Sequence, residues 1–337
     1  MRKNLFVRSI AAVSGIVMLA SLAACGDNTS SAGNNSGSTS TEKITGSFSG
    51  AGATSQQAAE EAWISAYMAA NSGANVTYNP TGSGAGVTTF LSGATAWAGS
   101  DKALSDDEVT QSSDKACANG TTAFDVPVYI SPIAIIFNLK GVSDAGKHIN
   151  LDADTAAKIF DGKIVKWNDP AIADQNKDLK LPDTAITVVH RSDKSGTTQN
   201  FVSYFKDVTP DNWTYDLSEN WPNEVGQGAK GTSGVISTVK QADGTIGYAD
   251  FSQVGDLGTV AVKVGDKYNE ISAEAGSKVI GDSKQDDTVK GDNRIVIKIN
   301  HATEAEGAYP IVLVSYDIVC PAYKDTKQAE FAKAWLT

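Results

Sequence analysis

Short apolar runs alternate with stretches of helical periodicity along most of this chain. The apolar runs have the length of β-strands and occupy residues 126–130 leading into 133–137, residues 186–189 and residues 311–314. Such alternation is typical of an α/β fold, in which helices cover a sheet. About 290 residues follow the polar N-terminal segment, which is enough for two domains with separate cores.

Two helices are predicted directly after polar loops. After residues 195–198, three apolar side chains recur at helical spacing: Phe201, Val202 and Phe205. Thr54 and Gln57 resemble a capping box that opens an earlier helix. The apolar residues of that helix form one stripe: Ala59, Ala62, Trp63, Ala66, Tyr67 and Ala70. The polar loops therefore lie at strand-to-helix turns, where open α/β sheets usually bind ligands.

Three of these loops are rich in Gly, Ser and Thr, at residues 50–55, 81–86 and 191–198. A helix N-terminus has unpaired N–H groups and a partial positive charge, so a loop of small residues there lets an oxyanion contact the backbone. Three such loops, with hydroxyls and one arginine among them, indicate a site for a small tetrahedral oxyanion. Ordinary turns and N-caps would give any one loop the same composition.

Other kinds of site fit the sequence less well. Gly50-Ala51-Gly52 and Gly84-Ala85-Gly86 lack the third glycine of a dinucleotide fingerprint, and no Gly-Lys-Ser/Thr supplies a phosphate-loop lysine. A nucleophile elbow needs glycine two residues before the serine, where Thr81 and Asp193 stand. The three histidines are scattered, with no Cys/His grouping at metal-ligand spacing. We therefore expect no catalytic residue, no metal, no cofactor and no enzymatic activity.

The N-terminus indicates export and lipidation. Three basic residues among the first eight precede an apolar run over residues 10–24, which closes with Leu22-Ala23-Ala24-Cys25. This pattern predicts a signal peptide over residues 1–24 that ends in a lipobox. Cleavage would leave an acylated Cys25 as membrane anchor, followed by a flexible tether over residues 25–45. The alternative is a short membrane helix, for which the apolar run is short.

Lipidation of Cys25 would leave two cysteines, Cys117 and Cys320, which are 203 residues apart. In an oxidising compartment they are expected to form a disulfide, and two unrelated buried thiols are the alternative.

The formal net charge is −11, and it becomes −14 without the three basic residues of the leader. This balance argues against a nucleic-acid partner. It also means that an anion would have to be captured by local dipoles and hydrogen bonds, because long-range attraction is absent.

Several segments, in this order and rough spacing, resemble the PstS family of phosphate ABC-transporter substrate-binding proteins. Four of them are residues 50–54, 82–84, 99–105 and 191–197. Outside the candidate site, Gly162-Lys163-Ile164 with Trp167-Asn168-Asp169-Pro170 is similar to that family's Gly-Lys-Ile and Trp-Asp segment. Gly244-Thr245-Ile246-Gly247-Tyr248 is similar to its Gly-Ala-Ile-Gly-Tyr strand. The resemblance covers nearly all of the chain from Gly46 onward.

The resemblance implies an α/β, two-lobed periplasmic-binding-protein fold of type II, in which two crossover strands form the hinge. Lobe I would comprise residues 46–131 plus 305–337, and lobe II residues 132–304. Cys117 and Cys320 would then share lobe I, which favours the disulfide. One departure is visible, because the family continues through further C-terminal helix whereas this chain stops at Thr337 inside a predicted helix.

The resemblance also implies a phosphate ligand set: Thr54, Ser55, Ser83, Asp101, Arg191, Ser195, Gly196 and Thr197. Most members would donate from hydroxyls and backbone amides, and Arg191 would present a planar fork to two phosphate oxygens. For Ser55 only the backbone role carries over, because the family often has an aromatic residue there. Asp193 would lie behind this set and hold Arg191 in place.

Asp101 needs an explanation, because a carboxylate should repel an anion. Phosphate at neutral pH still carries a proton, and an ionised carboxylate can accept a hydrogen bond from that P–OH group. Sulfate has no proton, so one of its lone pairs would face a lone pair of the carboxylate. A buried mismatch of this kind can favour binding of phosphate over sulfate by a factor of roughly 10⁴. The alternative is a solvated Asp at a turn.

The expected protein is a lipid-anchored receptor that binds inorganic phosphate on the extracytoplasmic face of the cell membrane. It would deliver the phosphate to the transmembrane subunits of an ABC permease, with the ligand joining donors from both lobes. Two alternatives stay open. One is a receptor for another tetrahedral oxyanion, such as sulfate or molybdate, and the other is a phosphate-ester hydrolase, which the lack of a nucleophile and metal ligands disfavours.

Overall fold

The structure is a computed structural model that describes residues 44–143 and 148–337. The predicted signal peptide, the lipidation site Cys25 and all but the last two residues of the tether lie outside the described residues. The described residues belong to one compact unit, Lys43–Thr337. Among the helices that are described, none combines the length and the hydropathy that a membrane crossing requires.

The unit is built on one 11-stranded sheet with helices on its faces. The strands of this sheet are β1 (Gly46–Gly52), β2 (Ala74–Asn79), β3 (Trp97–Ser100), β4 (Phe124–Asn138), β5 (Ile149–Leu151), β6 (Thr187–Arg191), β7 (Gln227–Ala229), β8 (Thr245–Asp250), β9 (Gly258–Val264), β10 (Lys267–Asn269) and β13 (Val312–Val319). A separate two-stranded ribbon pairs β11 (Lys284–Gln285) with β12 (Ile297–Lys298). The helices are α1 (Gln57–Ala70), α2 (Ser83–Leu91), α3 (Asp106–Lys115), α4 (Ala153–Phe160), α5 (Pro170–Ala173), α6 (Gly196–Val208), α7 (Gly231–Gln241), α8 (Ala273–Gly281), α9 (Thr326–Trp335) and the 3₁₀ helix η2 (Phe251–Gln253).

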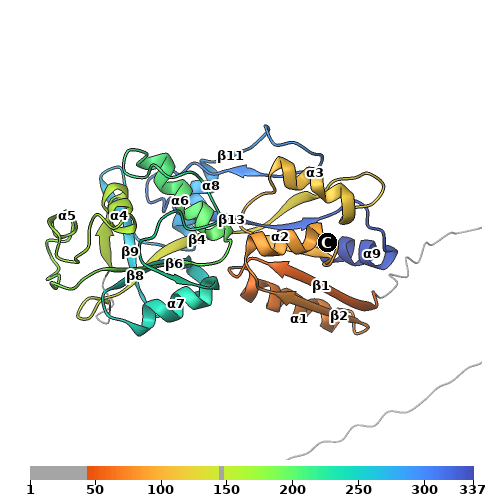
Figure 1. Cartoon of the computed structure of the whole chain (residues 1–337), viewed down its shortest axis with the longest axis horizontal. Helices are drawn as coiled ribbons and strands as arrows, with labels where there is room; N and C mark the ends of the chain where they lie inside the picture. The colour runs from red at the N-terminus through yellow and green to blue at the C-terminus, as the bar shows by residue number, and fades with distance from the viewer. Residues whose placement is uncertain (1–43, 144–147) are drawn as a thin grey trace, which may run out of the picture. The chain divides into compact units, whose positions relative to one another are not determined.

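Two long strands, β4 and β13, connect two groups of strands (Figure 1). The first strand group is β2-β1-β3-β13 with the first part of β4, and the second is the last part of β4 with β8, β6, β7 and β9. Residues 124–132 of β4 pair with β13, whereas residues 133–138 pair with β8. The two apolar runs predicted in this region therefore form one strand of 15 residues. Its register against β13 shifts beside Pro127, which cannot donate to the ladder.

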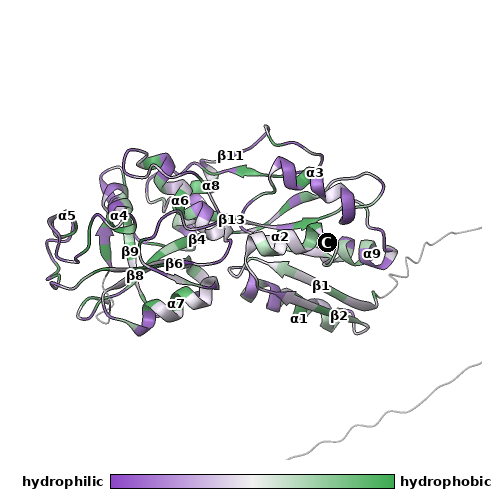
Figure 2. Cartoon of the chain, in the orientation of Figure 1, coloured by the Kyte–Doolittle hydropathy of each residue, from purple (hydrophilic) through white to green (hydrophobic). Residues whose placement is uncertain are grey.

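Each strand group has its own buried side chains, while hydrophilic residues concentrate on helices and loops (Figure 2). The second group packs Phe137, Phe160 and Trp167 with side chains of α6 and α7. In the first group, Trp97 and Phe331 are among the buried side chains. The division into a lobe of residues 46–131 plus 305–337 and a lobe of residues 132–304 stays a proposal.

The two predicted helices differ in outcome. Helix α6 is confirmed, because Phe201, Val202 and Phe205 are buried and the Ser195 hydroxyl caps the helix by accepting from the Thr198 amide at 3.1 Å.

The predicted capping box of α1 is wrong. The N-cap of α1 is Gln56, no side chain caps the helix, and the Thr54 hydroxyl bonds elsewhere. The predicted apolar stripe is wrong in part, because its alanines at positions 62, 66 and 70 are exposed. Tyr67 of the predicted stripe does pack on the core, together with Ile64 and Met68, which lie outside the stripe. Alanine offers little apolar area, so alanine positions do not decide which face of a helix is buried.

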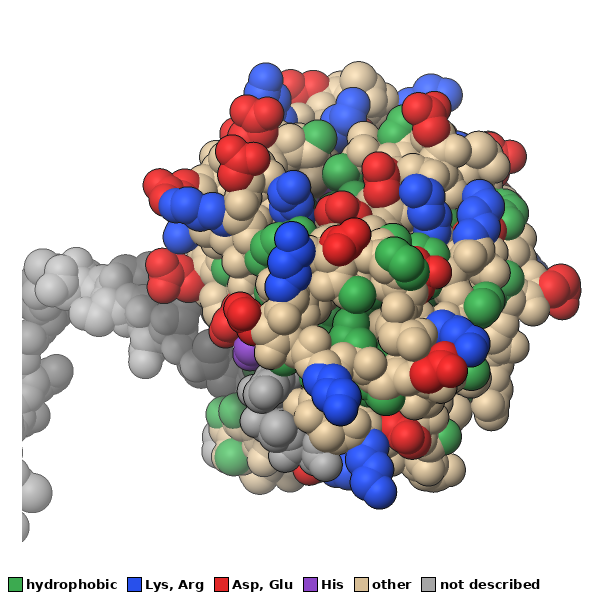
Figure 3. Space-filling view, turned by 90° about the vertical axis from the view of Figure 1, so that its left-hand side faces the viewer, with side chains coloured by type: hydrophobic (Ala, Val, Ile, Leu, Met, Phe, Trp, Pro, Cys, Tyr) green, Lys and Arg blue, Asp and Glu red, His purple; other side chains and the backbone are tan. Residues whose placement is uncertain are grey.

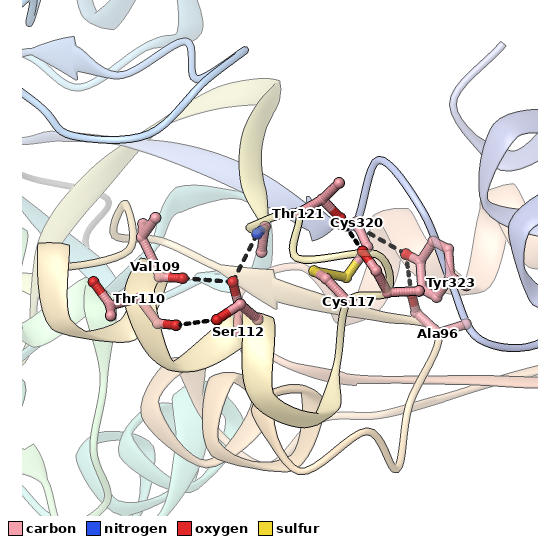
Figure 4. Close-up of a disulfide and its surroundings, with 11 residues drawn as sticks. Ala96, Val109, Thr110, Ser112, Cys117, Thr121, Cys320 and Tyr323 are labelled. Carbon is pink, nitrogen blue, oxygen red and sulfur yellow. Dashed lines mark hydrogen bonds between the residues drawn. A yellow bond between two sulfur atoms is a disulfide. The ribbon is translucent and has the colours of Figure 1, made fainter.

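The disulfide between Cys117 and Cys320 is confirmed, with an S–S distance of 2.07 Å (Figure 4). Beside it, the Tyr323 hydroxyl accepts from the Cys320 amide at 3.0 Å and donates to the Ala96 carbonyl at 2.7 Å. The disulfide links the end of α3 to the segment after β13. A closed loop of this length stabilises by up to roughly 5 kcal/mol in the chain-entropy model.

Two carboxylates are buried together between α1 and β13. Glu60 accepts from the indole of Trp97 at 3.0 Å, and Asp317 accepts from that of Trp335 at 3.0 Å. Burial, followed by the charge of Asp317, raises the pKa of Glu60, and burial raises the pKa of Asp317. A carboxyl whose pKa is raised by folding stabilises the protein below its unfolded pKa, and this contribution is lost as pH rises through the folded pKa.

We expect Glu60→Gln to reduce the decrease in the free energy of unfolding as pH rises. The amide keeps an acceptor for Trp97 but cannot ionise. Urea unfolding at about pH 5 and about pH 8 should show a smaller decrease for this variant than for the wild type. Glu61→Gln is the matched control, since Glu61 is the next residue on α1 and is exposed. Parallel pH curves for the wild type and Glu60→Gln would contradict the prediction.

Candidate functional site

The three Gly/Ser/Thr loops lie at the turns β1–α1, β2–α2 and β6–α6, and they touch one another. The Gly82 amide donates to the Gly52 carbonyl at 2.8 Å, and the Gly84 amide donates to the Lys194 carbonyl at 3.4 Å. A Cβ atom on Gly86 would lie 2.3 Å from the Gly52 Cα. The first two loops therefore pack backbone to backbone, and the third, from the second strand group, joins them.

Asp101 follows β3 and is the carboxylate at the centre of these loops. Its Oδ2 accepts from the hydroxyls of Ser55 at 2.5 Å and Thr197 at 2.8 Å, and its Oδ1 accepts from the Ser315 hydroxyl at 2.8 Å. Its amide donates to the Ser83 hydroxyl at 3.2 Å. Asp101 is 2% exposed, so it is not the solvated turn residue that was the alternative.

The carboxylate of Asp101 acts only as an acceptor in this arrangement. Burial raises its pKa, and the donated hydroxyls and the charge of Arg191 oppose that rise without cancelling it. An ionised carboxylate offers about four acceptor positions. Three of them hold the hydroxyls of Ser55, Thr197 and Ser315, which leaves one acceptor position for a proton-bearing ligand.

Arg191 ends β6 and is held in a bidentate pair. Its Nε and Nη2 donate to the two carboxylate oxygens of Asp193 at 2.8 and 2.6 Å, and its own amide donates to the Tyr248 hydroxyl at 3.2 Å. Burial would raise the pKa of Asp193, but the hydrogen bonds and charge of Arg191, with a bond from the Gly231 amide, lower it overall. The pair fixes the plane of a buried guanidinium and leaves it further N–H donors.

The start of α6 supplies backbone donors. The Ser195 oxygen caps the helix, so the amides of Gly196 and Thr197 belong to the first turn and have no acceptor inside the helix. Such amides are suited to anions. A Cβ atom on Gly196 would lie 2.8 Å from the Ser83 Oγ and 2.9 Å from the Asp101 Cβ, so only glycine allows this approach.

The loop before α1 is held from the second strand group. The Thr54 hydroxyl lies 2.9 Å from the Thr232 hydroxyl and accepts from the Thr232 amide at 3.0 Å. Gln253 donates to the carbonyls of Thr54 and Ser55 at 3.0 and 3.2 Å. Because a trans peptide points its N–H away from its C=O, the Ser55 amide points away from Gln253.

The structure therefore brings together all nine predicted site residues, from Thr54 and Ser55 to Asp193 and Thr197. Sequence reasoning missed Thr232, Gln253 and Ser315. A signal for Thr232 existed, since residues 231–234 form a fourth Gly/Ser/Thr run at a strand-to-helix turn. Ser315 and Asp317 are polar residues in the otherwise apolar strand β13, and nothing in the sequence marks Ser315 as a partner of Asp101.

The charge of the site is local. Arg191 is 3% exposed and has the carboxylates of Asp193 and Asp101 as neighbours. On the outer face shown in Figure 3, Lys and Arg side chains are interspersed with Asp and Glu, so no single sign dominates there. In the described part of the chain, no group of three or more His, Cys, Asp and Glu residues could hold a metal ion.

Known proteins resemble this chain over most of its length. A family model described as a PBP superfamily domain matches residues 37–337. The phosphate-binding protein PstS2 of Mycobacterium bovis is 37% identical over 346 aligned positions, which cover 98% of this chain and 90% of that protein. The phosphate-binding protein PstS of Xylella fastidiosa is 36% identical over 296 positions, which cover 86% of this chain and 75% of that protein.

Two solved structures share the fold. A phosphate-binding protein from Stenotrophomonas maltophilia superposes with a TM-score of 0.67 at 20% identity, covering 87% of this chain and 83% of that one. The other is a high-affinity periplasmic phosphate-binding protein, PfluDING, solved with bound phosphate. It superposes with a TM-score of 0.68 at 21% identity, covering 87% of this chain and 85% of that one. At these identities the likeness concerns the fold alone.

We expect Asp193→Asn to lower the free energy of unfolding by about 3 kcal/mol, because it leaves the buried Arg191 without its paired charge. The amide still offers an oxygen to the Gly231 amide. The control is Asp183→Asn, which breaks an exposed pair with Lys166 and should cost less than about 1 kcal/mol. Urea unfolding at neutral pH without added anions measures both losses, and losses of equal size would contradict the prediction.

Proposed function

The chain belongs to the PstS family of phosphate-binding proteins within the PBP superfamily, and we propose that it binds inorganic phosphate outside the cytoplasm for an ABC permease. Its α/β, two-lobed fold of periplasmic-binding-protein type II is the one that the family resemblance implies. One observation carries the proposal: a buried, bidentately held Arg191 shares a site with a buried Asp101 that has one acceptor position left.

The proposed ligands come from both strand groups. The hydroxyls of Thr54 and Ser83 and the amide of Ser55 lie on the first group, and Arg191 lies on the second with the donors of residues 195–197. A phosphate ion that accepts from both groups would favour their approach, which is how ligands close a hinged protein. In this proposal Asp193 holds Arg191 and does not touch the ligand.

Asp101 favours phosphate over other tetrahedral oxyanions. The P–OH group of hydrogen phosphate can donate to the remaining acceptor position of Asp101, whereas sulfate and fully ionised molybdate cannot. A receptor for sulfate or molybdate is the weaker candidate for this reason. A phosphate-ester hydrolase is the weaker candidate because neither Ser83 nor Ser195 stands in the Gly-x-Ser pattern of a nucleophile elbow.

We also propose that the protein is anchored to the membrane through lipid on Cys25 after removal of residues 1–24. Residues 25–45 would then serve as the tether between the anchor and the phosphate site. The transmembrane subunits of the permease would receive phosphate at the extracytoplasmic face. The sequence pattern of the N-terminus supports this part of the proposal.

We expect the wild-type protein to bind phosphate and Arg191→Ala to bind it about 100-fold more weakly, which corresponds to about 3 kcal/mol for a lost charged bidentate partner. Isothermal titration calorimetry on residues 26–337 measures both affinities. Lys240→Ala is the control, because it removes one positive charge from an exposed ion pair and should leave the affinity unchanged. Failure of the wild type to bind phosphate would refute the proposed function, and equal affinities would refute the role of Arg191.

Asp101→Asn should raise the affinity for sulfate relative to phosphate. The substitution removes the repulsion against a fully ionised oxyanion and supplies an amide donor. Competition of the two anions for each protein gives the ratio of affinities, with Asp256→Asn, at an exposed position, as control. If the ratio of sulfate to phosphate affinity changes by less than about twofold, well below the size of a polar mismatch, Asp101 does not accept a hydrogen bond from the phosphate proton.

Cys25→Ser should release the protein from the membrane fraction, because serine cannot carry the thioether-linked lipid. Fractionation after a carbonate wash, followed by immunoblotting, measures the release. A variant with both Cys117→Ser and Cys320→Ser keeps the lipobox and should stay with the membrane. Retention of Cys25→Ser in the membrane fraction would exclude the lipid anchor.

A further inference from the structure

The start of α7 contacts the proposed phosphate site without supplying a predicted ligand. Its first two amides are both used by site residues, since Gly231 donates to the Asp193 Oδ1 at 3.0 Å and Thr232 donates to the Thr54 Oγ1 at 3.0 Å. Gly231 has a φ of +71°, and a Cβ atom there would lie 3.3 Å from the Thr54 Cγ2. The helix start is therefore packed directly on Thr54.

The hydroxyls of Thr54 and Thr232 are 2.9 Å apart and both buried, so one of them donates to the other. A hydroxyl has one proton and two lone pairs. If Thr54 donated to Thr232, its proton would be used and it would present only a lone pair to an anion. If Thr232 donates, both lone pairs of Thr54 are engaged, by the amide and the hydroxyl of Thr232, and the Thr54 proton is available to an anion.

We propose that Thr232 is a positioning residue of the phosphate site, which engages both lone pairs of the Thr54 hydroxyl and thereby directs the Thr54 proton to the phosphate. This inference rests on the proposed function. In the proposed site the P–OH proton of hydrogen phosphate goes to Asp101, so the phosphate oxygen beside Thr54 only accepts. Phosphate binding then selects the arrangement in which Thr232 donates. Hydroxyls that donate in series also strengthen one another.

The contact has a second consequence, because Thr54 precedes α1 in the first strand group and Thr232 opens α7 in the second. The same pair of hydrogen bonds therefore orients a ligand hydroxyl and links the two groups when they are together. Thr232 acts on phosphate only through Thr54.

The test is a double-mutant cycle on the full mature chain, with inorganic phosphate as the probe. Thr232→Val replaces the donor by a methyl group and should weaken phosphate binding about tenfold, the size of one hydrogen bond in a charged site. Thr232→Ser restores a hydroxyl and should bind within about threefold of the wild type. In a Thr54→Val background, Thr232→Val should cause no further loss, because its route to the ligand is gone.

Thr238→Val is the matched control, since Thr238 lies on the same helix with its hydroxyl bonded to the Gly234 carbonyl. It should leave phosphate affinity unchanged. A tenfold further loss in the Thr54→Val background, or full affinity in Thr232→Val alone, would overturn the assignment of Thr232. A wild-type protein that does not bind phosphate in the same titration would instead overturn the proposed function.

Discussion

The arrangement of the site depends on one buried carboxylate. Asp101 is 2% exposed, so its oxygens cannot rely on water and need donors from the protein. The donors come from the loop before α1, from α6 and from β13, which are far apart in the chain. Satisfying Asp101 therefore requires three segments to meet at one point, and this meeting also places the predicted anion donors around a common centre.

A second constraint is the charge balance of a protein that would bind an anion while carrying a net charge of −11. Among the nine predicted site residues the cationic side chain is the buried guanidinium of Arg191, and Asp193 both neutralises and orients it. Such a pair does not attract an anion over long distances, because the two charges largely cancel beyond their immediate surroundings. Selectivity and affinity then rest on geometry: the N–H directions of Arg191, the amides at the start of α6 and the hydroxyl protons.

Local features of the sequence were predictable because their causes are local. The Ser195 cap and the buried Phe201 and Phe205 follow from capping chemistry and helical period, and the three loops were placed correctly at strand-to-helix turns. The family resemblance added the ligand set and favoured the pairing of Cys117 with Cys320.

The failures have tertiary causes. Thr54 was assigned to a capping box because the spacing to Gln57 fits one, but a partner 178 residues away takes its hydroxyl. The buried face of α1 was misjudged because alanines follow the helical period without adding much apolar area. The roles of Ser315 and Gln253 depend on which strands become neighbours, and periodicity along the chain carries no information on that point.

The hydrogen bonds of Asp101 also connect ligand binding to the approach of the two strand groups. Ser315 lies on β13, which pairs directly with β3 beside Asp101, and Ser55 belongs to the same strand group. Thr197 belongs to the other group. Separation of the groups would leave the Ser55 and Ser315 bonds intact but would break the Thr197 bond, and with it the bonds of Thr232 and Gln253 to the first loop. The donors of the site are thus complete only when the groups are together. An anion that needs the complete set would stabilise this arrangement by its higher affinity for it.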